Sequence, residues 1–554
     1  ARGEINAIDH PTVLAGDIGT TNDSSDNVYN VVIPSNGSLL DGFTIRDGNA
    51  SKNYGDARGW GAGIFADGIT FSVANCTITN NRARSRGGAV FLQDANATFS
   101  NCTFINNYGT AWGEANSYGY AGAIDLNKTS LTLDQCTFTN NQADLNGGAV
   151  YAKNSDINAT SCTFSHNQNT DNNGGGAMYL QDSNLTLLSS HFQSNQATSS
   201  SGGAIYFNGG NHVVRDSNFT SNSGGWGGAL YLSNADLNVS DSDFILSSST
   251  NSGGAIYSTD SNLTLLSSHF QSNQATSSSG GAIYLNETST SSLTDNIFKM
   301  NSATWGGAIA AKCQSLRIVG GSFIGNWANS GGGVYTQGAV ASHFEKIKAL
   351  GNEANATSDS KGGVAYFNTG SLGSKFINCI ISGNKASNRH GVFKSVAATQ
   401  IVNSSIVGNS SGEYGGVTLL FDSSEVLSIS NSIIWGNTAI QGENNIYVHQ
   451  GIASANYSLF DPSQSSSSVS GSNNISNNPL FIDANGTDNV YGTEDDDLRL
   501  QASSPAIDQA SDSVSDYPST DINGFSRNGV PDIGAYEFYS ATAPVFSSGT
   551  SFSV

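Results

Sequence analysis

Residues 182–206 read DSNLTLLSSHFQSNQATSSSGGAIY, and residues 260–284 repeat the same 25 letters without a change. The two copies begin 78 residues apart, which is three units of 26 residues. A duplication in whole units keeps every strand in register, whereas a fractional unit would turn buried side chains towards solvent. The 26-residue unit is therefore a structural repeat, and the chain is predicted to fold as a solenoid.

Two short motifs recur in phase along the chain. The first is Gly-Gly-Ala followed by Val, Ile, Leu or Met, and it begins at Gly87, Gly147, Gly175, Gly202, Gly227, Gly253, Gly280 and Gly306. The second is Phe-x-x-Asn, whose asparagines are Asn107, Asn141, Asn167, Asn195, Asn222, Asn273, Asn301 and Asn326. Later copies of the second motif carry Ile in place of Phe, as in Ile381–Asn384.

The repeat length and its composition predict an all-β fold, a right-handed parallel β-helix. A unit of 26 residues is too short for two packed helices, and β-branched and aromatic residues alternate with Ser, Thr and Asn. We expect one coil of two or three short strands per unit, with coils stacked at ~4.8 Å. Phe and Ile columns would fill the interior. The asparagines would form an internal ladder that bonds the turn backbone, a structural role rather than a ligand-binding one.

The composition excludes some classes of partner. The 554 residues include 22 Lys and Arg against 44 Asp and Glu, a formal net charge of −22, and only 12% are charged. A nucleic-acid-binding protein needs a basic surface, so no nucleic-acid partner is expected. No run of about 18 apolar residues occurs, so no transmembrane helix is predicted.

An enzyme is the main rival to a structural role, because pectin-lyase-like β-helices host polysaccharide lyases and glycoside hydrolases. A uronate lyase needs Arg or Lys to neutralise the substrate carboxylate and to remove a proton. Basic residues are scattered here, and no basic column recurs at 26-residue spacing. No Ser/His/Asp or Cys/His arrangement stands out either. We therefore predict no catalytic residue and favour a non-catalytic protein, with the enzyme left open.

An acidic segment near the C-terminus is the strongest chemical signal. Its candidate metal ligands are Asp483, Asn485, Asp488, Glu494, Asp495, Asp496 and Asp497. Oxygen ligands on a tight, glycine-containing loop suit Ca²⁺. The segment departs from an EF-hand, because Asp488 stands where glycine is required. The sequence leaves two interpretations: a structural Ca²⁺ that pins a C-terminal cap, or a solvated acidic turn.

Three tryptophans, Trp60, Trp226 and Trp305, stand just before a glycine turn. Exposed rings at these positions would stack on sugars, which makes them glycan-binding candidates. Buried rings would only pack against the turn and have a structural role.

The six cysteines are Cys76, Cys102, Cys136, Cys162, Cys313 and Cys379. Most share one position of the coil, which predicts a stacked apolar column of thiols. Stacked neighbours are poorly placed for a disulfide, although an even count still allows one bridge. The disulfide state stays open, as does glycosylation of the many Asn, Ser and Thr residues.

The paired motifs resemble a known surface repeat. Gly-Gly-Ala-Ile with Phe-x-x-Asn, over about residues 60–440, is similar to the repeats of the chlamydial polymorphic outer membrane proteins. Those proteins are adhesins, so the resemblance implies a β-helix and a role in adhesion.

A second resemblance covers the C-terminal part of the chain. Asn478-Pro479-Leu480-Phe481, Ser504-Pro505-Ala506-Ile507-Asp508 and Asp532-Ile533-Gly534-Ala535-Tyr536 follow one another in order. That order is similar to the closing segment of the choice-of-anchor Q β-helix proteins of bacteria. The resemblance implies a secreted protein, extracellular or at the bacterial cell surface.

These inferences divide the chain into four parts. N-terminal coils are expected at 1–46, β-helix repeats at 47–478, a small C-terminal cap at 479–540, and a linker or first strand of a following domain at 541–554. The predicted function is a non-catalytic surface protein, an adhesin or a structural rod. Its open strand edges favour head-to-tail assembly into a filament. The alternatives are a polysaccharide-active lyase or glycoside hydrolase, and a glycan-binding module.

Overall fold

The computed structural model describes residues 12–21, 23–52, 56–111, 119–170, 174–287, 291–338, 340–356, 360–368, 371–388, 391–395, 397–415, 417–419, 426–449, 451–527 and 529–539. These residues form short strands joined by turns, with two short 3-10 helices, η1 (Ala57–Gly59) and η2 (Pro462–Gln464). The predicted linker or strand at 541–554 lies outside the described residues, as do residues 1–11.

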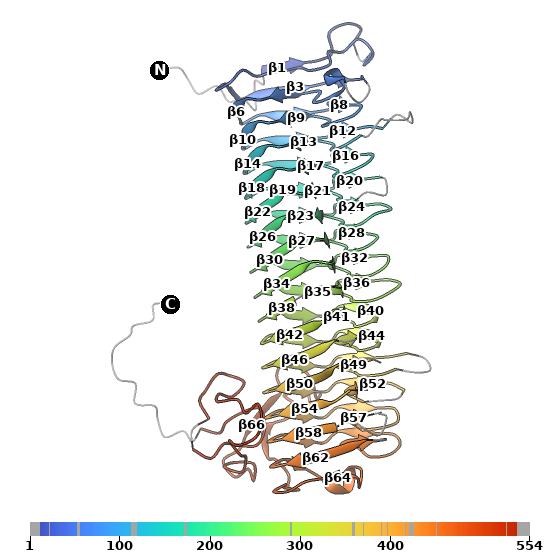
Figure 1. The fold of residues 1–554 in the computed structure, drawn as a ribbon, viewed down its shortest axis with the longest axis vertical. Helices are drawn as coiled ribbons and strands as arrows, with labels where there is room; N and C mark the ends of the chain where they lie inside the picture. Colours follow the sequence, from blue (N-terminus) through green and yellow to red (C-terminus); the bar gives the residue numbers. More distant parts are fainter. Residues whose placement is uncertain are drawn as a thin grey trace, which may run out of the picture.

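The strands wind into a long rod of stacked coils, the predicted parallel β-helix (Figure 1). Four parallel sheets run along the described rod, two of 17 strands and two of 15. The sheets are numbered in the order in which the chain meets them within a coil. The first runs from β5 (Ile64–Asp67) to β61 (Ile446–Val448), and the second from β2 (Leu39–Asp41) to β64 (Val469–Ser470). The third runs from β1 (Thr12–Ala15) to β63 (Leu459–Phe460), and the fourth from β4 (Asn49–Ala50) to β60 (Thr438–Ala439).

One coil from the middle of the rod shows the pattern. It consists of β29 (Leu230–Ser233), β30 (Asp236–Ser240), β31 (Asp243–Ile245) and β32 (Ser248–Ser249). Each pairs in parallel with its equivalent in the next coil, namely β33 (Ile256–Thr259), β34 (Asn262–Leu266), β35 (His269–Gln271) and β36 (Gln274–Ala275). The coil has four strands rather than the expected two or three, because the short segment that follows the ladder position, residue 247 in this coil, also pairs with its neighbours.

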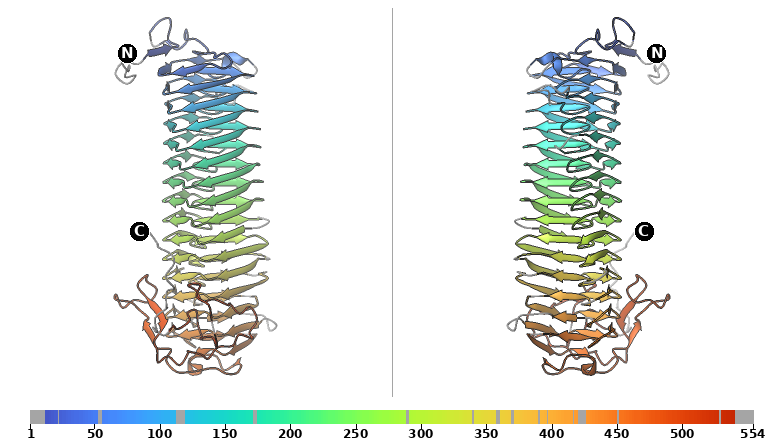
Figure 2. Two further views of the ribbon diagram at one scale, coloured as in Figure 1. Left: turned by 90° about the vertical axis from the view of Figure 1, so that its left-hand side faces the viewer. Right: turned by 90° about the vertical axis from the view of Figure 1, so that its right-hand side faces the viewer.

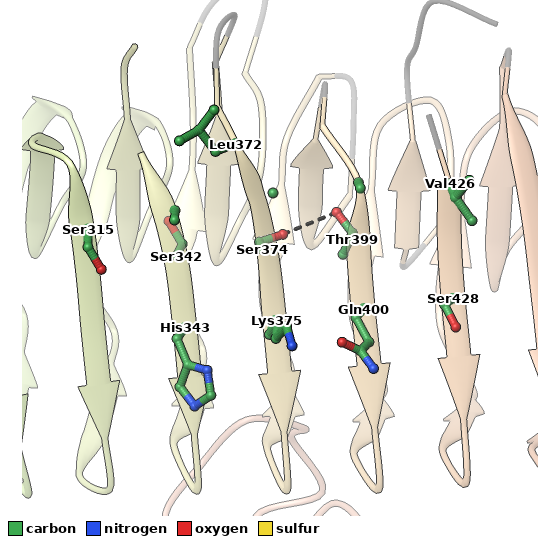
Figure 3. A pocket seen from close by; sticks show the side chains of 13 residues that line it. Ser315, Ser342, His343, Leu372, Ser374, Lys375, Thr399, Gln400, Val426 and Ser428 are labelled. Atoms are coloured by element: carbon green, nitrogen blue, oxygen red, sulfur yellow. Dashed lines mark hydrogen bonds between the residues drawn. The ribbon is translucent and has the colours of Figure 1, made fainter. Parts of the chain in front are cut away.

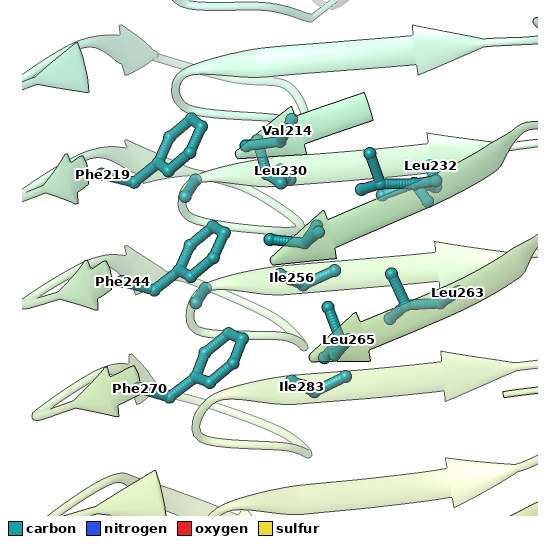
Figure 4. Close-up of a cluster of buried hydrophobic side chains, with 14 of the residues drawn as sticks. Val214, Phe219, Leu230, Leu232, Phe244, Ile256, Leu263, Leu265, Phe270 and Ile283 are labelled. Carbon is teal, nitrogen blue, oxygen red and sulfur yellow. The ribbon is translucent and has the colours of Figure 1, made fainter. Parts of the chain in front are cut away.

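A column of phenylalanines fills the interior behind the third sheet. Successive rings stack with centroids 4.5–5.0 Å apart from Phe104 to Phe323. Figure 4 shows Phe219, Phe244 and Phe270 in this column, beside the aliphatic side chains of the other sheets. The spacing follows from the strand separation of a β-sheet, so a one-per-coil aromatic residue stacks on its own copies.

The motif asparagines form a buried ladder at the corner between the third and fourth sheets. In the repeating arrangement, Oδ1 of Asn141 accepts hydrogen bonds from the backbone N–H and the Nδ2 of Asn107, at 3.1 and 3.0 Å. The Nδ2 of Asn107 also donates to the carbonyl of Ile78. The same pattern links the described asparagines of the predicted set, and it continues through Asn81, Asn352, Asn384, Asn409 and Asn437. The ladder is interrupted once along this run, at Ser247.

The C-terminal residues 481–539 pack against the side of the rod rather than over its end (Figures 1 and 2). A short antiparallel pair, β65 (Phe481–Asp483) with β66 (Asp497–Leu500), belongs to this cap. Its apolar side chains bury the outward-facing Leu350, Ile380, Val407, Ile433 and Leu459 of the third sheet. Earlier coils carry mainly polar residues at these outward positions, such as Thr137, His191 and Asp243, so the last coils offer a more continuous apolar face for docking.

Tyr491 of the cap packs against a column of glycines on the rod. The residue before each ladder asparagine has positive φ, and it is Asn, Ser, His, Leu or Met in the early coils but Gly from Gly325 to Gly436. A Cβ atom added at Gly408 would lie 2.2 Å from the ring of Tyr491, and one at Gly383 would lie 1.9 Å from the Tyr491 carbonyl oxygen. Glycine at these positions makes room for the acidic segment.

Candidate functional site

The three candidate tryptophans occupy one position of the coil, against the outer face of the first sheet. Each packs on an aromatic ring of the next coil: Trp60 on Phe91 at 4.9 Å, Trp226 on Tyr257 at 5.2 Å and Trp305 on Tyr335 at 5.4 Å between ring centroids. Trp226 and Trp305 each remain 39% exposed. The rings therefore close the turn and also present part of their surface to solvent.

An outward-facing tyrosine column runs beside these tryptophans, and the sequence prediction did not include it. Its members are Tyr151, Tyr179, Tyr206, Tyr231, Tyr257 and Tyr284, in register on neighbouring strands of the first sheet. Centroids of adjacent rings lie 4.5–5.7 Å apart. The signal was present in the sequence, since Tyr follows Gly-Gly-Ala-x in most repeats.

Stacking decides what this tyrosine column can present to a ligand. The ring faces cover one another, and Tyr151 and Tyr257 are only 4% and 8% exposed, so the column presents ring edges and hydroxyl groups rather than open ring faces. Burial raises the pKa of Tyr179, Tyr231 and Tyr284. These hydroxyls therefore stay protonated at neutral pH and act as neutral hydrogen-bonding groups.

The acidic segment is organised by its own hydrogen bonds. Oδ2 of Asp495 accepts from the backbone N–H and the Oγ1 of Thr487, at 2.8 and 2.7 Å, and its Oδ1 accepts from Oγ1 of Thr493 at 2.7 Å. These bonds from Thr493 and Thr487 lower the pKa of Asp495 to about 2. Asp488 accepts from the backbone N–H of Val490 at 2.8 Å.

The remaining candidate ligands reach protein partners or solvent. Glu494 pairs with Lys299 at 2.6 Å, Asp497 pairs with Arg499 at 2.5 Å, and Asp496 accepts from Ser382 at 3.2 Å. Asp483 is exposed and Asn485 is half-buried. Across the described residues, His, Cys, Asp and Glu side chains form no group of three or more that could hold a metal ion. Calcium stays a prediction, and the structure gives the segment a second role in docking the cap.

The cysteines are buried and form no disulfide with one another. All six are free thiols in the interior. Burial raises the pKa of Cys76 to about 11 and that of Cys379 to about 12. The thiols of Cys76 and Cys379 are therefore expected to be unreactive in the native state.

A groove of about 460 Å³ lies on the second sheet near the cap. It crosses β42 (Ser315–Val319), β46 (Ala341–Glu345), β50 (Gly373–Ile377), β54 (Thr399–Val402) and β58 (Val426–Ser430), and so runs along the rod axis (Figure 3). Small residues line its base, while a row of polar side chains from successive coils forms one wall. No residue of this groove was among the sequence candidates.

Protein partners occupy the charged groups in and around the groove. His343 lies 3.3 Å from Glu345, and Arg317 lies 3.1 Å from the same carboxylate. Lys375 pairs with Asp516 of the cap at 2.8 Å. The polar wall thus offers hydrogen bonds without a net charge.

Comparison with known families agrees with the architecture. The family model of the right-handed β-helix region matches residues 21–192 of the chain, which correspond to the first coils of the rod. The fold is a right-handed parallel β-helix with about 26 residues per coil. No curated protein gives a significant match. In the described part of the chain, no helix has the length and apolar character required to cross a membrane.

Proposed function

We propose that the protein is a non-catalytic rod displayed outside a bacterial cell, where it acts as an adhesin or as a structural spacer. The in-register duplication carries this proposal. Leu185 and Leu263 lie at the same buried position of the second sheet, and Phe192 and Phe270 share the interior aromatic column. An active site depends on contacts between particular coils, whereas a rod is only lengthened by three added coils.

The outer surface supports the same proposal. The tyrosine column continues through both copies of the duplicated block, since Tyr206 and Tyr284 close them. The duplication therefore extended a displayed surface along with the core. A repeated surface gives many equivalent contacts to an extended partner, which raises avidity without a new type of contact.

Deletion of residues 182–259 tests the rod. The deletion joins Gln181 to Asp260, and the second copy then meets the same upstream neighbours that the first copy met, because the two blocks are identical. We expect a folded protein about 14 Å shorter, the height of three coils. It should adhere to bacterial or host surfaces nearly as well as the full chain. A deletion variant that folds but loses adhesion completely would contradict a distributed binding surface.

The rival function is a polysaccharide-active enzyme, favoured by the His343–Glu345 pair at the groove. A screen of neutral and acidic polysaccharides for newly formed reducing ends or unsaturated products decides between the two. Turnover that disappears in His343→Ala but persists in His166→Ala, a change at an exposed histidine, would replace the rod with an enzyme.

Head-to-tail assembly is the second part of the proposal. At the N-terminal end of the described rod, Ile33 and Leu39 expose 70% and 62% of their surfaces near the edge strands. Exposed strand edges with apolar side chains accept strands from other chains. Light scattering over a concentration series should show a mass that rises with concentration, and a constant monomer mass would contradict assembly.

A further inference from the structure

The groove on the second sheet has a built form that other coils lack. The connection from the first to the second sheet is two residues long between β29 and β30, whereas five residues separate β49 (Ala365–Phe367) from β50. At this corner Leu372 and Val426 are 68% and 41% exposed and form an apolar wall. The base between the walls consists of Ala341, Gly373 and Ala398 from adjacent coils.

The interior below the groove is also unusual. Ser342, Ser374 and Thr399 take the inward position that Leu316 and Leu427 hold in the flanking coils. Ser374 and Thr399 are hydrogen-bonded at 3.1 Å. Ser342 lines the groove, is 4% exposed, and its Oγ finds no hydrogen-bond partner among the described residues. These hydroxyls face the interior, so the polar contacts open to a ligand in the groove come from the outward-facing residues of the same strands.

The charged groups around the groove favour a ligand without a net charge. His343 and Arg317 share the carboxylate of Glu345, and Lys375 pairs with Asp516. An anionic ligand would have to break these pairs, and a cationic one would meet cations already in place. A neutral ligand meets hydroxyls and an amide instead, supplied by Ser428 and Gln400 on one wall.

We propose that this groove binds a neutral oligosaccharide lying along the rod axis. The groove crosses five strands of one sheet, a length of about 20 Å, which suits an extended chain better than a single small molecule. The apolar faces of sugar rings would contact Leu372 and Val426, and the sugar hydroxyls would face the polar wall. Sites that combine an apolar wall with a few placed polar groups are typical of ligand pockets.

Two tryptophan substitutions at the same position of the second sheet test the site. Ala341→Trp fills the base of the groove, and Asp236→Trp places the same ring at the same strand position in a coil outside it. Both positions are exposed, so neither ring disturbs the core. Equal melting temperatures of the two variants and the parent would show that both remain folded.

The probes are cellohexaose, xylohexaose and mannohexaose, with hexagalacturonate as the anionic arm, each titrated by calorimetry. At least one neutral hexasaccharide should bind the parent and Asp236→Trp alike, and bind Ala341→Trp at least about tenfold more weakly, a loss of about 1.4 kcal/mol. Absence of binding by every neutral probe, equal binding by both variants, or tighter and salt-sensitive binding of hexagalacturonate would each overturn the proposal.

The proposal is separable from the non-catalytic function. Products are analysed in the same samples after titration. Cleavage of a bound hexasaccharide would overturn the non-catalytic rod and leave the groove assignment in place. Binding without cleavage supports both.

Discussion

The backbone N–H of Ser247 donates a hydrogen bond to Oδ1 of Asn273, at 3.0 Å. Ser247 stands at the ladder position between Asn222 and Asn273, where the neighbouring coils carry asparagine. Its Oγ is buried and has no hydrogen-bond partner among the described residues. The serine side chain is too short to reach the backbone groups that an asparagine would bond, so the ladder is weakest here.

Ser247→Asn should repair the ladder. The new Nδ2 would donate as that of Asn222 does to the carbonyl of Phe192, and the new Oδ1 would accept from Asn222. We expect the free energy of unfolding in urea to rise by about 1 kcal/mol, the net value of a buried hydrogen bond. The matched change Asn195→Ser should lower it by a similar amount. A Ser247→Asn protein less stable than the parent would show that the coil has closed around the serine.

His212 makes stability depend on pH. It replaces the leucine found at the same inward position in the adjacent coils, Leu185 and Leu237, and burial lowers its pKa to about 4. Its pKa in the unfolded chain is about 6.5, so the folded state favours the neutral ring. Above pH 6.5 the ring is neutral in both states and this stability is fully present. As the pH falls from 6.5 to 4, the unfolded chain binds a proton that the folded protein does not, so the free energy of unfolding falls by about 3 kcal/mol in all.

His212→Leu should remove that dependence. The difference in unfolding free energy between variant and parent should grow as the pH is lowered from 7 to 4, measured by urea titration at each pH. His166→Asn is the control, because His166 is exposed and Asn140 holds the equivalent place one coil earlier. A pH profile that is the same for all three proteins would contradict the burial argument.

Gly408→Asn should loosen the cap. Asparagine tolerates positive φ, as at Asn140, so the cost comes from the clash with Tyr491, at about 1–3 kcal/mol. Cleavage by thermolysin near Val490 should become about tenfold faster or more. Gly325→Asn is the matched control, because a Cβ there meets only the side chain of Met300 at 3.9 Å. Equal cleavage of both variants would contradict the docking role of the glycine column.

The six thiols should not react with a thiol reagent in the native protein. All six thiols are buried, with at most 7% of the residue exposed, so Ellman's reagent at pH 8 should find almost no reactive thiol over an hour. In denaturant without a reducing agent, all six cysteines should react. Four reactive thiols instead of six would reveal one disulfide.

Calcium binding by residues 483–497 is tested by titrating chelator-treated protein with CaCl₂. A bound ion would draw on carboxylates such as Asp488 and Asp495 and should slow thermolysin cleavage of this segment. Magnesium at the same concentration is the control for ionic strength. No heat of binding and no protection would leave the hydrogen bonds of Thr487 and Thr493 as the sole means of ordering Asp495.

The repeating part of the molecule could be predicted because its contacts are local and periodic. Phe192 stacks on its copy 27 residues later, Phe219, and the same step places Asn195 on Asn222. Each coil meets only its neighbours, so the period in the sequence becomes the period in space. The tyrosine column followed the same rule and could have been predicted from the Gly-Gly-Ala-x-Tyr pattern.

The docking of the cap could not be predicted from periodicity, since it joins segments as far apart as Lys299 and Glu494, 195 residues along the chain. Two signs were nonetheless present. Ile380-Ile381 and Ile433-Ile434 place apolar residues on both faces of a strand, and such strands are covered on both sides. The change from Asn or Ser to Gly before the ladder asparagine marks where Tyr491 lies. The groove depends on irregular corners such as that at Leu372, for which the repeat gives no rule.

The two identical blocks also have a consequence for recombination in the gene. Any exchange between the stretches that encode 182–206 and 260–284 inserts or removes 78 residues, and every junction it produces is one that already folds. Each such event changes the reach of the molecule by about 14 Å, in steps of three coils. The length of the rod is therefore set by the number of copies of the duplicated block. Relatives that differ in length by multiples of 78 residues would share the same first and last coils.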